Sequence, residues 1–343
     1  MRGLTMAATV GLLLIGGCAS TEPAPTTQAA ETARPLAVEQ SEWRERAISE
    51  LVMLARDPTP IVRANALEAL SLAPARLESQ VAAGLADQNE GVRAIAAMLV
   101  GRERLGGLVE ATRPLMNDPS PYVRVSAVAS LRRLGEPVDP TPIAEMLLGD
   151  PSPRVRAHAA RALGDLGDAS ALPLLADAYS LDPPLATPNE AAVMRLQIAE
   201  SMIRLGDRTK LEGVRAALFP SRPEDLELAA LAVQIIGEVE DRASAGQVIQ
   251  LSTYREGGRP MPAEVRLECA TTAAKLGYRD GGFIAEEFTT SEVAVLRVQA
   301  ATAWGWIGGE TGLSRCRTLL GDPDPRVRAA AAAGVIRIAS RGI

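Results

Sequence analysis

Histidine and aromatic residues are scarce in this chain of 343 residues. His158 is the only histidine, and aromatic residues make up 3% of the sequence. A single histidine excludes histidine-based catalytic triads and zinc sites that need two or more imidazole ligands. The sequence also has no P-loop and no dinucleotide-binding glycine motif. We therefore expect no enzymatic activity, no metal and no cofactor, although chemistry that uses carboxylates alone, such as a glycosidase pair, stays open.

Lysine is nearly absent as well. Lys210 and Lys275 are the only two lysines, so almost every cation is an arginine, and the formal net charge is −6. Sequence-independent binding of nucleic acid depends on neutralising phosphates with an excess of basic residues. A mildly acidic chain is a poor candidate for that task, and we expect no nucleic-acid partner.

The N-terminus has the features of a targeting segment. Arg2 precedes an apolar run, Leu4 to Ile15, which is too short to span a bilayer. The run ends in Leu14-Ile15-Gly16-Gly17-Cys18, which resembles the lipobox of bacterial lipoproteins. The resemblance implies a signal peptide over residues 1–17 and a lipid on Cys18. An ordinary secretory signal and a simple apolar tail are the alternatives.

The lipobox resemblance also implies a location. The protein would be anchored in the membrane through the lipid on Cys18, on the extracytoplasmic side of a bacterial cell envelope. Ala19, rather than aspartate, follows the cysteine and favours the outer over the inner membrane. Residues 18–40 are rich in small polar residues and proline, and they lack apolar periodicity. That composition predicts a disordered tether between the lipid and a folded region.

One sequence unit recurs over residues 41–343. In the copy that begins at Asp150, Asp-Pro-Ser-Pro precedes apolar residues at helical spacing that continue to Gly167. Pro153 fits the first position of a helix, the Ser152 hydroxyl can cap it, and Gly167 can end it in a left-handed conformation. The unit therefore predicts a helix from Pro153 to about Gly167. Other copies begin at Asp57, Asp87, Asp118 and Asp322.

An apolar–arginine pair, or its equivalent, marks each copy at intervals of 30 to 39 residues. These anchors are Val62, Val92, Val123, Val155, Met194, Leu228, Val265, Leu296 and Val327. A period in this range, with helical patterns on both sides of a proline-rich turn, indicates a solenoid of helix pairs. The unit resembles HEAT repeats, especially the short variant of phycobilin lyases and deoxyhypusine hydroxylase. We expect an all-α solenoid, a superhelix of about nine HEAT-like helix pairs.

Aspartate and arginine lie six residues apart in the best-formed copies, and their role follows from the resemblance. In HEAT proteins the matching residues form a ladder of hydrogen bonds between successive repeats. The ladder would be structural and would be interrupted where the aspartate is absent, before Met194, Leu228 and Leu296. Its predicted members are Asp57, Arg63, Asp87, Arg93, Asp118, Arg124, Asp150, Arg156, Asp322 and Arg328.

The second helix of each pair can be divided into faces by counting from its anchor at about 100° per residue. Cys269 falls at a core position that is alanine in other copies, and Cys316 is similarly placed in a first helix. Both cysteines should therefore be buried small hydrophobic residues that form no disulfide. At the third, sixth and tenth residues after the anchor, the side chains are mostly polar and lie on one face.

That polar face should line the concave side of the solenoid, as second helices do in HEAT-like proteins. Its mixed charge suits a protein or peptide partner. The predicted groove residues are Arg133, His158, Arg161, Asp165, Gln197, Glu200, Arg204, Gln234, Glu238, Glu268, Lys275, Gln299 and Trp306. We expect Trp304 to be buried and Trp306 to be an exposed binding anchor; packing of Trp306 over a neighbouring helix or the Arg337 stem is the alternative.

The sequence therefore favours a monomeric, lipid-anchored scaffold or adaptor that binds another envelope protein on its concave face. Two other functions stay open. One is a chaperone-like or lyase-like enzyme of the short-repeat group, by analogy of fold alone. The other is a structural spacer that binds nothing specific.

Overall fold

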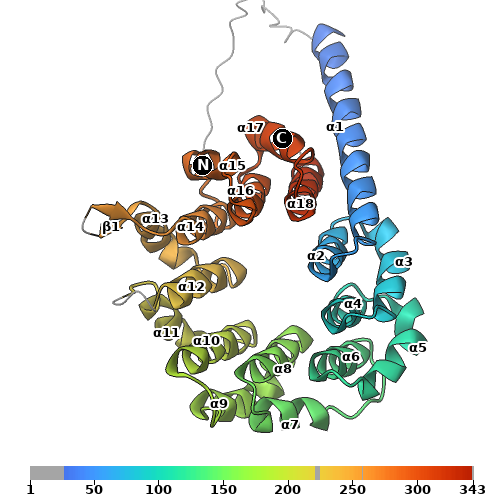
Figure 1. The fold of residues 1–343 in the computed structure, drawn as a ribbon, viewed down its shortest axis with the longest axis vertical. Helices are drawn as coiled ribbons and strands as arrows, with labels where there is room; N and C mark the ends of the chain where they lie inside the picture. The colour runs from blue at the N-terminus through green and yellow to red at the C-terminus, as the bar shows by residue number, and fades with distance from the viewer. Residues whose placement is uncertain (1–26, 221–224, 257, 342–343) are drawn as a thin grey trace, which may run out of the picture. The chain divides into compact units, whose positions relative to one another are not determined.

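The computed structural model describes residues 27–220, 225–256 and 258–341, whose regular secondary structure is almost entirely α-helical (Figure 1). The chain divides into two compact units, residues 1–40 and 41–343, and the helix pairs belong to the second. Among the described residues, no helix has the length and apolar character that crossing a bilayer requires. The predicted signal peptide and Cys18 lie outside these residues.

The predicted solenoid of nine helix pairs is confirmed. Each sequence anchor lies in the second helix of its pair. The second helices are α2 (Pro60–Leu70), α4 (Glu90–Arg102), α6 (Pro121–Arg133), α8 (Pro153–Leu166), α10 (Pro188–Arg204), α12 (Leu226–Glu238), α14 (Ala263–Lys275), α16 (Ala294–Ile307) and α18 (Pro325–Arg341).

The first helices form the other layer of the solenoid, and several are short. They are α1 (Thr27–Leu54), α3 (Pro74–Leu85), α5 (Val109–Thr112), α7 (Thr141–Gly149), α9 (Leu172–Ser180), α11 (Leu211–Ala216), α13 (Ala245–Thr253), α15 (Gly282–Thr289) and α17 (Gly309–Leu319). Between α13 and α14, strand β1 (Arg255–Glu256) pairs antiparallel with β2 (Arg259–Pro260). This hairpin lengthens the connection between the two helices of the seventh pair.

Helix α1 corrects the expectation that residues 18–40 lack regular structure, because it begins at Thr27. Alanine, glutamate and glutamine recur in this stretch and are good helix formers. Extending an existing helix also avoids the unfavourable nucleation step. Composition typical of a tether therefore does not prevent helix formation next to a stable helix.

Helix α8 shows how the repeat unit begins and ends a helix. It starts at Pro153 and ends at Gly167, whose φ of 77° is left-handed, as the sequence predicts. Ser152 is the N-cap, but its hydroxyl makes no capping hydrogen bond. Instead, Asp150 Oδ1 accepts from the Ser152 backbone N–H at 2.8 Å. The aspartate, rather than the serine, therefore fixes the turn.

Successive second helices pack closely because small residues line the surfaces where they meet. A Cβ added to Gly101 of α4 would lie 2.6 Å from the α-carbon of Ser130 in α6. The Ser130 hydroxyl donates to the Ala97 carbonyl between the same two helices at 2.6 Å. An alanine- and glycine-rich core with few aromatic rings therefore fills its volume by bringing backbones together.

An arginine ladder links successive pairs on part of the solenoid. Arg63 donates Nε and Nη2 to the two Asp87 oxygens at 2.8 and 2.7 Å. Arg93 binds Asp118 in the same way, at 2.8 and 3.0 Å. Each arginine also donates to the carbonyl of the aspartate six residues before it, Asp57 or Asp87, at 2.8 Å. Each ladder arginine therefore fastens a turn to its own helix and to the next repeat.

The ladder differs from its predicted course at two places. Arg297 binds both oxygens of Asp322 at 2.8 and 2.9 Å, although the aspartate before Leu296 is missing. At this junction the arginine of the preceding repeat, Arg266, binds both oxygens of Glu287 instead, at 3.0 and 2.7 Å. Among the described residues, Arg124 and Asp150 form no bond; Arg124 instead donates to the Asp118 carbonyl. Their separation of 26 residues exceeds the 24 or 25 of the bonded pairs.

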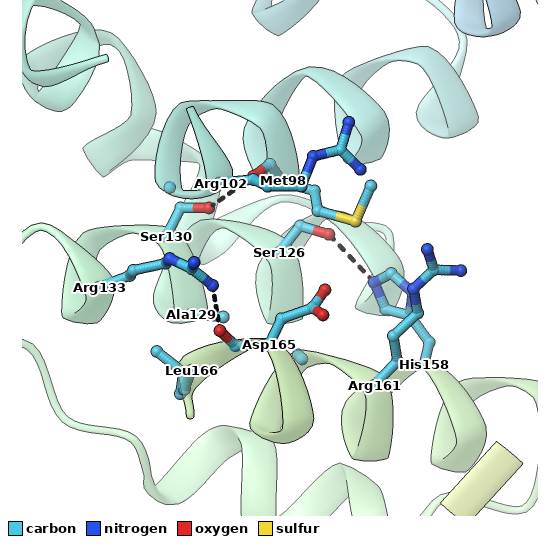
Figure 2. A pocket seen from close by; sticks show the side chains of 12 residues that line it. Met98, Arg102, Ser126, Ala129, Ser130, Arg133, His158, Arg161, Asp165 and Leu166 are labelled. Atoms are coloured by element: carbon cyan, nitrogen blue, oxygen red, sulfur yellow. Dashed lines mark hydrogen bonds between the residues drawn. The ribbon is translucent and has the colours of Figure 1, made fainter. Parts of the chain in front are cut away.

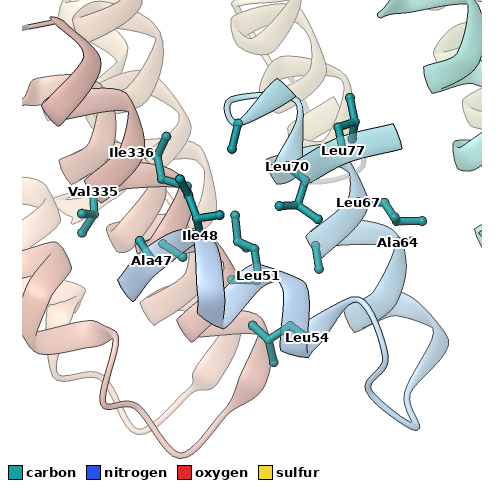
Figure 3. Close-up of a cluster of buried hydrophobic side chains, with 14 of the residues drawn as sticks. Ala47, Ile48, Leu51, Leu54, Ala64, Leu67, Leu70, Leu77, Val335 and Ile336 are labelled. Carbon is teal, nitrogen blue, oxygen red and sulfur yellow. The ribbon is translucent and has the colours of Figure 1, made fainter. Parts of the chain in front are cut away.

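The first and last helix pairs pack against each other, so residues 41–343 form a closed ring (Figure 1). In Figure 3, Val335 and Ile336 of α18 lie beside Ala47 and Ile48 of α1, and all four are buried in one hydrophobic cluster. Arg328 Nε donates to Glu50 Oε1 at 2.7 Å, where the next repeat's aspartate would stand. The concave face expected on an open superhelix is therefore the inner wall of a ring.

Candidate functional site

The tenth residue after each anchor lies near the C-terminal end of its second helix. We call eight of these residues the inner rim: Arg102, Arg133, Asp165, Arg204, Glu238, Lys275, Trp306 and Arg337. The first five line one cavity of about 550 Å³, together with Gly164, Ile203, Arg208, Val239 and Glu240. Helices α4, α6, α8, α10 and α12 therefore bring their rim residues to a common space.

The rim has more cations than carboxylates. Its four arginines and one lysine, less Asp165 and Glu238, give a net charge of +3, whereas the whole chain carries −6. Cations near helix C-termini are favoured by the helix dipole, which accounts for part of this distribution. The excess nevertheless gives an acidic protein a net positive charge along the inner rim.

Glu238 is the carboxylate around which several cations gather. Lys275 Nζ lies 2.6 Å from its Oε1, and Arg204 Nη2 lies 3.6 Å from its Oε2. Arg204 also binds Glu200 at 2.7 Å. Burial opposes ionisation of Glu238, but Lys275 and Arg204 outweigh burial and lower its pKa. Glu238 is therefore held ionised, and it joins α10, α12 and α14 along the rim.

Trp306 lies against three cationic side chains. The guanidinium carbons of Arg337 and Arg341 lie 4.4 and 4.7 Å from its ring centroid, and Lys275 Nζ lies at 5.4 Å. Trp306 is consequently half-buried, and the expectation that it is an exposed anchor is wrong. Trp304 is buried, as predicted, and donates its ring N–H to Thr289 Oγ1 at 2.9 Å.

His158 lies at the edge of a much smaller pocket between α4, α6 and α8 (Figure 2). Its Nε2 is 3.0 Å from Ser126 Oγ and 3.1 Å from the Tyr122 carbonyl oxygen. Because a carbonyl can only accept, Nε2 carries the proton and cannot serve as a base toward Ser126. Burial lowers the pKa of His158, so the ring is neutral. The His158–Ser126 pair therefore stabilises the packing of α8 on α6.

The pocket beside His158 is too small for a ligand. Its volume is about 30 Å³, roughly the space of one water molecule. Arg133 reaches across it and donates Nη1 to the main-chain oxygen of Asp165. Arg161 lies at its border and is exposed. The larger cavity at the rim is therefore the better candidate for binding.

The structure does not bring the remaining predicted groove residues into the large cavity. Gln197 lines a separate shallow pocket with Asn189 and Glu190. Gln234 is exposed on α12, one turn before Glu238. Burial raises the pKa of Glu268, and the buried side-chain oxygen of Gln299 has no hydrogen-bond partner among the described residues.

The sequence placed Arg102 and Arg337 on the groove face by their position after the anchor, but it did not indicate Arg208 and Arg341 as members of this surface. Arg102 and Arg337 occupy the same position after the anchor as the predicted rim residues. Arg341 lies one helical turn beyond Arg337. The sequence signal for this surface was the tenth position after the anchor, which is a cation in five of the nine pairs.

The two core cysteines are buried, as their alignment with alanine predicts. Burial raises the pKa of both thiols, that of Cys316 to about 12. Such thiols are protonated near neutral pH and unreactive. Within the described ranges, no three histidine, cysteine or acidic side chains are grouped so that they could hold a metal ion.

Comparison with known proteins supports the repeat assignment. A family model for HEAT repeats matches residues 109–197 and 141–232, and a second HEAT repeat model matches residues 313–341. No curated protein matches the sequence.

Solved structures with a similar fold include two enzymes. The complex of CpcE and CpcF of phycocyanin lyase from a Nostoc species is 17% identical with a TM-score of 0.41, over 77% of this chain and 93% of that one. Human deoxyhypusine hydroxylase in complex with glycerol is 19% identical with a TM-score of 0.37, over 78% and 98%. An engineered protein is 19% identical with a TM-score of 0.36, over 68% and 97%.

These similarities correct the expectation that the chain is not an enzyme. That expectation relied on the single histidine and the missing nucleotide-binding motifs, yet the similar structures include a lyase and a hydroxylase. A solenoid of this kind therefore does not exclude catalysis. At such identities and TM-scores the likeness concerns the fold and assigns no reaction to this chain.

Proposed function

We propose, from the premise that this chain is a HEAT-repeat protein, that it is an adaptor whose inner rim binds an acidic segment of a protein partner. The adaptor would be anchored in a bacterial cell envelope through a lipid on Cys18. The partner would meet the second helices, whose rim residues share a cavity of about 550 Å³. HEAT repeats commonly mediate binding between proteins, which agrees with this use of the ring.

The observation that carries the proposal is the rim charge of +3 in a chain of net charge −6. Complementary charge guides a partner to the correct surface and excludes partners of the wrong sign. An acidic segment would be repelled by the chain as a whole and attracted by the rim. A spacer that binds nothing would need no such concentration of arginine.

The proposed location depends on the sequence alone. The run Leu14-Ile15-Gly16-Gly17-Cys18 supports lipidation, and Ala19 favours the outer membrane. Labelling of cells with radioactive palmitate tests this part separately. We expect label in the wild-type protein and none in Cys18→Ala; label that survives the substitution would contradict the anchor.

Site-specific crosslinking tests the binding surface. A photoreactive amino acid at Gln234, exposed on the inner side of α12, should crosslink to a partner protein in envelope membranes. The matched control replaces Gln247, which is exposed on the first helix α13. A glutamate-rich peptide should suppress the product at Gln234, and its glutamine counterpart should not.

Equal crosslinking from both positions would contradict binding at the inner rim. A product that nuclease treatment removes would identify nucleic acid as the bound molecule, against the proposal. Absence of any product at Gln234, with the protein correctly anchored, would favour the spacer function.

A further inference from the structure

We propose that Arg337 and Arg341, stacked on Trp306, form a carboxylate-binding site on the inner rim. The proposal rests on the proposed function, because it assigns a specific binding site to the partner's acidic segment. Arg341 was not predicted from the sequence, and Arg337 was named there only as a packing partner of Trp306. Helix α18 supplies both arginines, and α16 supplies the ring.

Neither guanidinium group is bound to a carboxylate in the described part of the chain, although Arg337 Nη1 lies against Gly305, 3.2 Å from where a Cβ would stand. A guanidinium carbon 4.4 or 4.7 Å from the ring centroid lies against the π face. A contact of this kind does not consume an N–H donor in a hydrogen bond. Among the described residues, neither Arg337 nor Arg341 makes a hydrogen bond or an ion pair. The indole therefore positions two forks of donors without occupying them.

The neighbouring cations of the rim are already paired, which sets these two apart. Lys275 is bound to Glu238 at 2.6 Å, and Arg204 to Glu200 at 2.7 Å. Arg337 is partly buried without such a partner. Burial, together with the charge of Arg341, lowers the pKa of Arg337 to about 10. An anion at this place would offset both unfavourable contributions.

The surroundings favour a carboxylate over a phosphate dianion. Two guanidinium forks match the planar, two-oxygen geometry of a carboxylate. Glu238 lies close enough to raise the pKa of Arg337, so it would also repel an incoming anion. The attraction by the two arginines and the repulsion by Glu238 both double for a dianion, so the distinction from phosphate rests on the planar two-oxygen geometry. Glu238 also lines the large cavity, so a bound side chain would continue along the same wall.

Calorimetric titration of the full chain with a glutamate-rich peptide tests the site. Arg341→Gln should weaken binding about tenfold or more, the usual consequence of losing a charge-assisted hydrogen bond. Arg337→Gln should do the same. The matched control is Arg326→Gln, about 16 Å away along α18, whose guanidinium binds Asp324 at 2.6 Å. It removes one charge but should leave the affinity unchanged.

The ring of Trp306 supplies a second readout. Its fluorescence should change when the peptide binds to the wild-type protein, and Trp306→Phe should abolish that change. Arg341 is exposed, so its substitution leaves the fold intact, and circular dichroism verifies folding of every variant. Arg341→Gln thus decides the question even if Arg337→Gln is destabilised.

The outcomes separate this site from the wider function. Undiminished peptide binding in both arginine variants, with crosslinking at Gln234 still suppressed by the peptide, would overturn the site and leave the adaptor function standing. Tighter binding of inorganic phosphate than of the peptide would overturn the carboxylate assignment. Absence of peptide binding and of crosslinking would reject the site and the proposed function together.

Discussion

The arginine ladder and the inner rim both consist of arginine and carboxylate side chains, yet their charge balance differs. In the ladder, Arg63, Arg93 and Arg297 each bind both oxygens of one aspartate. In the rim, five cations face two carboxylates, and Arg337 has no acidic partner among the described residues. Paired charges satisfy the protein's own hydrogen bonds, whereas unpaired ones remain available to a partner. Pairing, rather than residue type, distinguishes the structural array from the candidate site.

The largest effect is expected where the two ends of the ring meet. The ladder bonds join only neighbouring repeats, whereas the rim residues follow the inner wall of the whole ring. Val335→Asp places a carboxylate in the buried cluster between α18 and α1. An unpaired buried charge costs several kcal/mol, so we expect the first and last pairs to separate. Small-angle X-ray scattering should show a larger radius of gyration, while circular dichroism retains the helical signal.

Val295→Asp is the control for this change, because Val295 is exposed on α16. It introduces the same residue and should leave the scattering curve unaltered. A radius of gyration that is unchanged in Val335→Asp would show that closure does not depend on this cluster. Loss of the helical signal would instead show that the ring folds as a single cooperative unit.

Removal of a ladder carboxylate should have the next largest effect. Asp118 is buried, binds Arg93 and accepts the Ser120 backbone N–H at 2.9 Å. Asp118→Ala leaves three N–H donors without their acceptor, and we expect a loss of about 2–3 kcal/mol in the free energy of unfolding. Urea denaturation measures this loss. The exposed Glu110, which pairs with Arg113, provides the control Glu110→Ala, with a change of less than about 0.5 kcal/mol.

The ladder contribution should also depend on pH. Burial raises the pKa of Asp118, but hydrogen bonds from Arg93 and Ser120 outweigh it and lower the pKa overall. Since the folded-state pKa is lower than the unfolded one, the stabilisation is present above about pH 4. It is lost as the pH falls through the folded-state value. The stabilities of wild type and Asp118→Ala should therefore converge in acid; a constant difference would contradict this origin.

The repeat could be predicted from the sequence because each copy contains the residues that form its own turn. Pro153 begins α8 and Gly167 ends it, as their backbone preferences require. Closure of the ring could not be predicted from the individual repeats, because it depends on the curvature summed over nine helix pairs. One signal was available: a terminal solenoid repeat needs a polar outer face, and the last repeat instead contains the buried Val335 and Ile336.

The candidate site was only partly predictable for a related reason. Position after the anchor correctly grouped Arg133, Asp165, Arg204 and Glu238, which share one cavity. It left packing of Trp306 on Arg337 as an alternative and did not show that Arg341 also covers the ring, because that contact depends on side-chain conformations of two adjacent helices. A helical face specifies which residues are neighbours, but not which of them remain unpaired.

The smallest effect on stability should come from Asp165→Ala. This substitution removes an aspartate from the rim, as Asp118→Ala removes one from the ladder, so the two changes can be compared directly. Arg133 binds the main-chain oxygen of Asp165, and that bond survives the substitution. We expect the free energy of unfolding to change by less than about 0.5 kcal/mol, in contrast to Asp118→Ala. Removal of one negative charge from the cavity wall should, however, raise the affinity for a glutamate-rich peptide a few-fold at low salt. Weaker peptide binding by this variant would show that the carboxylate itself binds the partner, and the excess of cations would then not be the basis of recognition.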